Sequence, residues 1–114
     1  MKMPRPADDD RRRFEALVPD DPRVVVKPMF GNLGAFVNGN MFMGLFGPAV
    51  GVKLSADDAA VLSAVDGAGP LGPAERPMGG YVALPPDLIG TPEGQRWASA
   101  ALAYVATLPP KARK

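Results

Sequence analysis

The side chains that could do chemistry in this sequence are carboxylates, hydroxyls and lysines, because its 114 residues include no cysteine and no histidine. Without cysteine the chain has no disulfide, no thiolate nucleophile and no cysteine metal ligand. Without histidine it lacks the commonest general base and the commonest transition-metal ligand. Catalysis or metal binding would therefore depend on oxygen ligands and on lysine.

The carboxylates gather in two short clusters, Asp8–Asp10 and Asp57–Asp58. A magnesium or calcium site needs several oxygen ligands that converge on one point. Both clusters lie at predicted helix starts, where acidic side chains stabilise the positive end of the helix dipole. We therefore predict that these acids stabilise helices and form no metal site.

The hydroxyl groups and the glycines also lack a catalytic pattern. No serine lies in Gly-x-Ser-x-Gly, and the spacing does not support a serine–lysine pair with Lys27 or Lys53. The run 31–34 does not match the dinucleotide fingerprint, and no Gly-Lys-Ser/Thr closes a phosphate loop. We predict no catalytic residue, no cofactor and no metal, and hence a protein that is not an enzyme.

The overall charge gives no general attraction to nucleic acid or to an anionic membrane, because 13 basic residues oppose 12 acidic ones. The uncharged stretch 28–52 could suggest a membrane span, but glycines, prolines and an Asn-Gly turn interrupt it. We therefore expect a cytoplasmic protein that does not enter a membrane. Weak nucleic-acid binding by Arg11–Arg13, Lys27 and the tail 111–114 remains an alternative.

Three segments have the capping residues and spacing of helices. The first spans about 8–17, with Asp8–Arg12 and Asp9–Arg13 as i,i+4 pairs. The second follows Ser55, buries Val61 among others and ends at Gly67. The third runs from the N-cap at 91 to the prolines at 109–110. Residues 1–7 and 111–114 are expected to be loose ends of a single domain that spans 1–114.

Between the helices lie short apolar runs typical of strands, at about 23–27, 34–37, 41–46, 49–54 and 81–84. The dipeptide Asn38-Gly39 predicts a type I′ turn between the second and third runs. Runs of strands flanked by helices, without strand–helix alternation, indicate an α+β fold with an antiparallel sheet.

The uncharged hairpin region is the most informative feature. In 41–46 both alternating sets are apolar, with Met41, Met43 and Leu45 expected on one face and Phe42, Gly44 and Phe46 on the other. Either helices cover one face while small or partly exposed residues line the other, or the second face or an edge strand is a protein interface. Methionine suits an adaptable contact surface.

The order of these motifs resembles that of the TfoX N-terminal domain family. The resemblance covers about residues 14–111 and includes Met29-Phe30-Gly31, Val37-Asn38-Gly39-Asn40-Met41-Phe42 and Val52-Lys53-Leu54 before a capped helix. Arg76-Pro77-Met78 before the strand at 81–84, and the close of the last helix, are similar to a single-domain branch. The runner-up is the YjbR/MmcQ "double wing" type, which shares a strand that ends in lysine.

The resemblance implies an α+β fold: an antiparallel sheet of about five strands with helices packed on it, in the order α-β(3)-α-β(2)-α. It also implies a regulatory module without known catalysis, from a family of competence regulators thought to act with a cAMP-receptor-type transcription factor.

We therefore expect a small non-enzymatic module that acts through contact with a protein, such as a transcription factor or a second copy of the chain. The alternatives are the nucleic-acid binder and a small-ligand binder or enzyme with Lys53 in a pocket. The candidate interaction surface consists of Met29, Phe30, Met41, Phe42, Met43, Lys53 and Met78.

Overall fold

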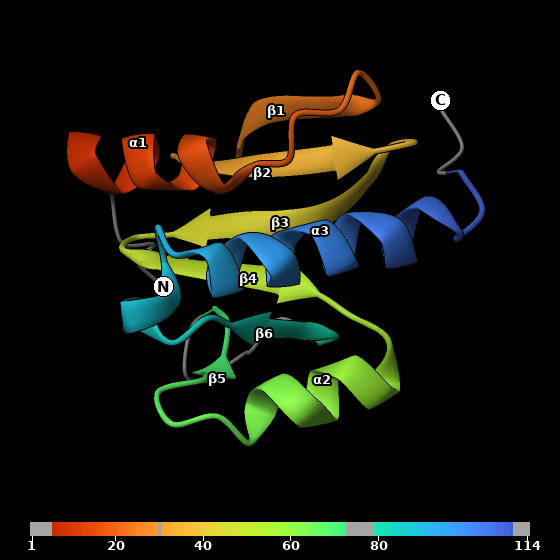
Figure 1. Ribbon diagram of the computed structural model, residues 1–114. Coiled ribbons are helices and arrows are strands. Elements are labelled where there is room, and N and C mark those ends of the chain that lie inside the picture. The colour runs from red at the N-terminus through yellow and green to blue at the C-terminus, as the bar shows by residue number, and fades with distance from the viewer. Residues whose placement is uncertain (1–5, 30, 73–78, 111–114) are drawn as a thin grey trace.

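The computed structural model describes residues 6–29, 31–72 and 79–110, which form a sheet layer and a helical layer (Figure 1). The described helices are α1 (Asp8–Leu17), α2 (Ala56–Ser63), the 3-10 turn η1 (Pro86–Leu88) and α3 (Pro92–Ala106). The described strands are β1 (Val24–Met29), β2 (Asn32–Val37), β3 (Asn40–Phe46), β4 (Ala49–Lys53), β5 (Gly69–Pro70) and β6 (Tyr81–Ala83).

The strands form one antiparallel sheet in the order β1-β2-β3-β4-β6-β5. This arrangement confirms the predicted α+β class with an antiparallel sheet. The expected count of about five strands becomes six, because four strands rather than three precede α2 and two short ones follow it.

Two tight turns connect the central strands. Asn38 and Gly39 both have positive φ angles, of 53° and 81°, as the predicted type I′ turn between β2 and β3 requires. Gly47, with φ of 60°, precedes Pro48 in the turn between β3 and β4. A glycine with positive φ at the first central position is the mark of a type II′ turn, whose twist also suits a hairpin.

A β-bulge interrupts the pairing of β2 with β3. Ala35 pairs with Met43 and Phe36 pairs with Met41, so that Phe42 is an extra residue without a partner in the register. The expected alternation along β3 is therefore wrong. Phe42, Met43 and Leu45 are all buried in the helix-side core, whereas Met41 lies on the opposite face with Gly44.

The core lies between the sheet and the helices. In Figure 1, α1 and α3 lie over the sheet, and α2 lies beside β6. The largest helix side chains in the core come from Phe14 and Leu17 on α1, Leu62 on α2, and Leu102 and Val105 on α3. One apolar cluster thus unites all the helices named above with one face of the sheet.

The helix ends follow local chemistry, with two corrections. The α1 bounds are as expected, but its ion pairs are i,i+3: Asp8–Arg11, Asp9–Arg12 and Asp10–Arg13. The Ser55 hydroxyl accepts the Asp58 N–H at 3.3 Å, as a cap should. Helix α2 ends at Ser63, before Gly67, and Val61 is 59% exposed rather than buried.

Side-chain hydrogen bonds tie α3 to the rest of the fold. The Thr91 hydroxyl accepts the Gly94 N–H at 3.2 Å and so caps the helix start. Gln95 Nε2 donates to the Leu17 carbonyl at the end of α1, at 3.1 Å. Asn40 Nδ2 donates to the Pro109 carbonyl beyond the other end of α3, at 3.0 Å. These bonds fix how α3 crosses the sheet.

Asn32 is a buried polar residue at the start of β2, and it leads to a first prediction. Its Oδ1 accepts the N–H of Gly47 in the next turn, at 2.9 Å. Replacement of Asn32 by alanine deprives a buried N–H of this acceptor, which costs about 1–3 kcal/mol of unfolding free energy. Urea unfolding of the variant, with the wild-type protein as control, measures the loss. An Asn32→Ala protein no less stable than the control would contradict this role.

An exposed ion pair before β1 gives a pH prediction. The Asp21 carboxylate accepts hydrogen bonds from Arg23 Nε and Nη2, both at 3.0 Å, and from its backbone N–H at 2.8 Å. The guanidinium hydrogen bonds, and then the backbone one, lower the pKa of Asp21 from 3.8 to about 2.

A folded-state pKa below the unfolded value means that this pair stabilises the fold above about pH 4, and that the contribution disappears as the pH falls towards 2. The variant Arg23→Gln removes the cation, so the pKa of Asp21 should rise towards its usual value. Carboxyl carbon NMR during an acid titration reads the change. An Asp21 pKa that is the same in both proteins would show that Arg23 is not its cause.

Candidate functional site

The face of the sheet that points away from α1 and α3 is called the open face here, because no described helix packs on it. Its side chains come from alternate positions of the strands, as the register requires. They include Val25, Lys27, Met29, Phe36, Met41, Lys53 and Tyr81, with glycines 34, 44 and 51 between them.

A row of residues without side chains crosses the open face. Gly34 pairs with Gly44, and Gly44 pairs with Gly51, so the three glycines lie side by side on β2, β3 and β4. A Cβ on Gly34 would lie 2.9 Å from the Met41 sulfur, and one on Gly51 would lie 2.3 Å from Leu71 Cδ2. A side chain at either position would have to displace its neighbour, so glycine allows these neighbouring side chains to approach the sheet closely.

Leu71 fills one end of this glycine row. It follows β5 and is only 1% exposed, yet it lies outside the core beneath the helices. Its methyl groups are the nearest side-chain atoms to Gly51 and also approach Gly44. At the other end, the sulfur atoms of Met29 and Met41 close over Gly34. The open face thus has a small apolar cluster of its own.

The charges on the strands are two lysines, and both lie on the open face. Lys27 Nζ lies 4.8 Å from the centre of the Phe36 ring, and Lys53 Nζ lies 5.7 Å from the centre of the Tyr81 ring. Distances in this range are those of cation–π contacts. Within residues 6–29, 31–72 and 79–110, neither lysine forms an ion pair. Among these residues, Lys53 therefore has an aromatic ring and not a carboxylate as its neighbour.

Tyr81 links two strands that are not neighbours. Its hydroxyl donates to the Met41 carbonyl at 2.8 Å, across β4, and so satisfies a carbonyl next to the bulge. Burial raises the pKa of Tyr81 above 10.0, so the phenol stays protonated at neutral pH and acts as a donor. This position makes Tyr81 part of the frame of the open face.

The structure separates the sequence-predicted surface residues into three groups. Met29, Met41 and Lys53 lie on the open face. Phe42 and Met43 are fully buried in the core, so they cannot touch a partner directly. The other two, at positions 30 and 78, lie outside the described residues.

Sequence reasoning missed three residues of the open face, Lys27, Phe36 and Tyr81. The Asn38-Gly39 turn fixes how β2 and β3 pair next to the turn. Because side chains alternate between the two faces along β2, this pairing places Phe36 on the face that points away from the core. That signal was present in the sequence. The contact of Tyr81 with Met41 depends on the later pairing of β6 with β4, which no local pattern gives.

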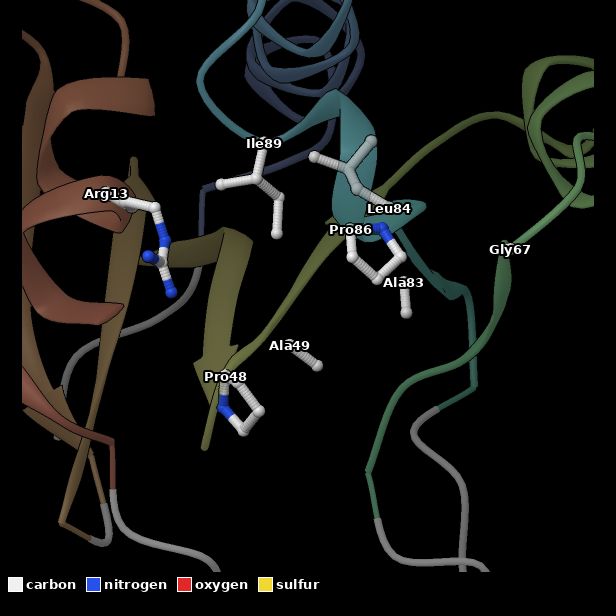
Figure 2. A pocket seen from close by; sticks show the side chains of 8 residues that line it. All are labelled: Arg13, Pro48, Ala49, Gly67, Ala83, Leu84, Pro86 and Ile89. Carbon is white, nitrogen blue, oxygen red and sulfur yellow. The ribbon is translucent and has the colours of Figure 1, made fainter. Parts of the chain in front are cut away.

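A separate cleft of about 470 Å³ opens between α1, the β3–β4 turn and the η1 region (Figure 2). Figure 2 shows the Arg13 side chain extending from α1 towards the cleft, opposite Pro86 of η1. Arg13 is the lining residue that carries charge, and its guanidinium is already paired with Asp10. The lining is otherwise apolar: Pro48, Ala49, Gly67, Ala83, Leu84, Pro86 and Ile89. Such walls supply no pair of groups for acid–base catalysis.

A second hollow of about 520 Å³ is lined by residues of α2 and α3. They are Asp58, Glu93, Arg96, Trp97 and Ala100. Its charged members are exposed to water, which leaves their charges screened. In the part of the chain that the structure describes, no group of three or more metal-binding side chains is close enough to hold an ion. None of the described helices combines the length and the apolar character needed to cross a membrane.

An antiparallel sheet with helices over one face, and a second face on which no described helix packs, defines a small α+β domain. The model of the TfoX N-terminal domain family matches residues 9–105, and the chain belongs to this family. No curated protein and no solved structure shows significant similarity to the chain.

The close fit of Leu71 against Gly51 makes a prediction about the open face. The variant Gly51→Ala places a methyl group in the space of the leucine, which costs about 1–3 kcal/mol of unfolding free energy through overpacking. In a Leu71→Ala background the same change should cost much less, because the obstructing atoms are gone.

Urea unfolding of the four proteins in this double-mutant cycle measures the coupling. Gly69→Ala is the matched control, since a Cβ there meets nothing within 4 Å. Strictly additive effects of the two changes would show that Leu71 does not occupy the glycine row.

Proposed function

We propose that this chain is a non-enzymatic regulatory module that binds a protein through the open face. The supporting observation is the composition of that face: two methionines, two aromatic rings and two lysines, with no described helix over them. Methionine side chains adapt to differently shaped partners, and aromatic rings supply contact area with little loss of conformational entropy. Apolar side chains that are partly exposed and grouped on one face in this way are typical of an interaction site.

Membership of the TfoX N-terminal domain family supports regulation as the process served. On this proposal the partner is a transcription factor or another component of transcription, and the module works in the cytoplasm. The chain contributes recognition, and the partner contributes contact with DNA. Fold alone does not decide between such roles, so the proposal stands on the open face.

Direct binding to nucleic acid has less support from the structure. Arg11, Arg12 and Arg13 are three of the seven basic residues in the described part of the chain, and each is paired with an aspartate one helical turn earlier. A paired arginine releases fewer counterions when it approaches a phosphate, and this release drives most non-specific binding. The alternative predicted from the arginines is therefore the weaker one.

The test is capture of partners from lysate of the organism that encodes the chain, with three tagged proteins compared by quantitative mass spectrometry. The first is the wild type. The second carries Val25→Ser and Phe36→Ala on the open face, and the third carries Val61→Ser on α2 as a control. Val25 and Val61 are similarly exposed, at 52% and 59%, so the two serine substitutions are matched.

A protein captured by the wild type and by the control, and lost at least about tenfold with the open-face variant, is the expected result. Circular dichroism and thermal melting check that all three proteins are folded. Equal capture by all three, or capture of nothing above an empty tag, would contradict the proposal.

A further inference from the structure

The distribution of charge between the two layers bears on the chemistry that a partner would need. The described strands contain no carboxylate, and their two charged residues, Lys27 and Lys53, are both on the open face. The described aspartates and glutamates all belong to helices and loops. The molecule therefore presents a helical layer rich in acids and an open face whose described charges are positive.

The two lysines are available to a partner. Each is held over an aromatic ring rather than by a carboxylate of its own chain within the described residues. A cation–π contact keeps the ammonium group in place while its N–H donors stay free for an acceptor. An acidic partner would form charge-assisted hydrogen bonds there, whereas a second copy of the same face would oppose lysine to lysine.

The spacing of the lysines sets the geometry of that partner. Lys27 is on β1 in register with the glycine row, and Lys53 is on β4, two residues beyond Gly51 of that row. With strands about 4.8 Å apart and about 3.4 Å per residue, their Cα atoms lie roughly 16 Å from each other. Phe36 on β2 and Met41 on β3 lie between them.

The edge of the sheet formed by β1 is poorly suited to pairing with a strand of a partner. The Val24 N–H already donates to the Asp21 carbonyl at 3.0 Å, and Pro28 has no N–H, so β1 offers few donors along its outer side. Lys27 adds a charge that discourages strand pairing. A partner is therefore better accommodated across the strands than beside them.

We propose that the partner docks an amphipathic acidic helix across the open face, with carboxylates three turns apart on Lys27 and Lys53. Three turns are about eleven residues and about 16 Å, which matches the separation of the lysines. The apolar side chains between these carboxylates cover Phe36 and Met41, as in other helix-on-groove complexes. This inference rests on the proposed function and adds the class of partner to it.

Zero-length cross-linking tests the pairing directly. A water-soluble carbodiimide joins lysine Nζ to a carboxylate only when the two are in contact. The tagged wild-type chain is treated with it in nuclease-treated lysate, and the cross-linked peptides are sequenced by mass spectrometry. The expected products join Lys27 and Lys53 to two acidic residues of one protein, about eleven positions apart in a helical segment.

Charge reversal provides the second readout. The variant with Lys27→Glu and Lys53→Glu should weaken capture of that protein at least about tenfold, and the Lys→Gln pair should weaken it less. Arg96→Glu is the charge-matched control, since Arg96 is exposed on α3 and makes no ion pair with a described residue. Thermal melting establishes that each variant is folded. If the double glutamate variant does not fold, the double glutamine variant is used for the comparison.

The possible results distinguish failure of the acidic-helix proposal from failure of the proposed protein-binding function. A protein whose capture needs Phe36 but is indifferent to both lysine variants would overturn the acidic helix and leave protein contact standing. Lysine cross-links to carboxylates of a second copy, to carboxylates of irregular spacing or to no partner at all would also overturn it. Capture of nothing that depends on the open face would overturn both.

Discussion

The packing of α1 and α3 against a single face of the sheet is the constraint on which the rest of this structure depends. It requires every strand to send one set of side chains into a shared core and the other set away from it. The central strands contain almost no polar residue with which to cover the second face. The second face must therefore be formed from apolar and small residues, and their arrangement determines what this face can bind.

The bulge in β3 and the row of glycines together determine how the open face is packed. The extra residue at Phe42 lets β3 bury three large side chains beneath the helices while Met41 turns to the open face. The glycines at 34, 44 and 51 then leave room for Met41 and Leu71 to lie flat against the sheet. An apolar face is thus kept tightly packed, and the lysines over Phe36 and Tyr81 add charge at positions far apart on the sheet.

Features set by local chemistry could be predicted from the sequence. The turn at Asn38-Gly39, the caps at Ser55 and Thr91 and the bounds of α1 depend on a few neighbouring residues, and the structure confirms them. The burial of Phe42 and Met43 could not be predicted, because a bulge depends on how two strands pair. The place of Leu71 over Gly51 arises from a contact between distant segments, which periodicity does not show.

The methionines give the most direct test of the claim that the open face is the contact surface. Met29 and Met41 lie on that face, whereas Met43 is fully buried beneath the helices and serves as an internal control. In a protein with carbon-13 methionine methyl groups, addition of the captured partner should shift and broaden the NMR signals of Met29 and Met41. The signal of Met43 should change little. Unchanged signals of Met29 and Met41 with a bound partner would contradict the account.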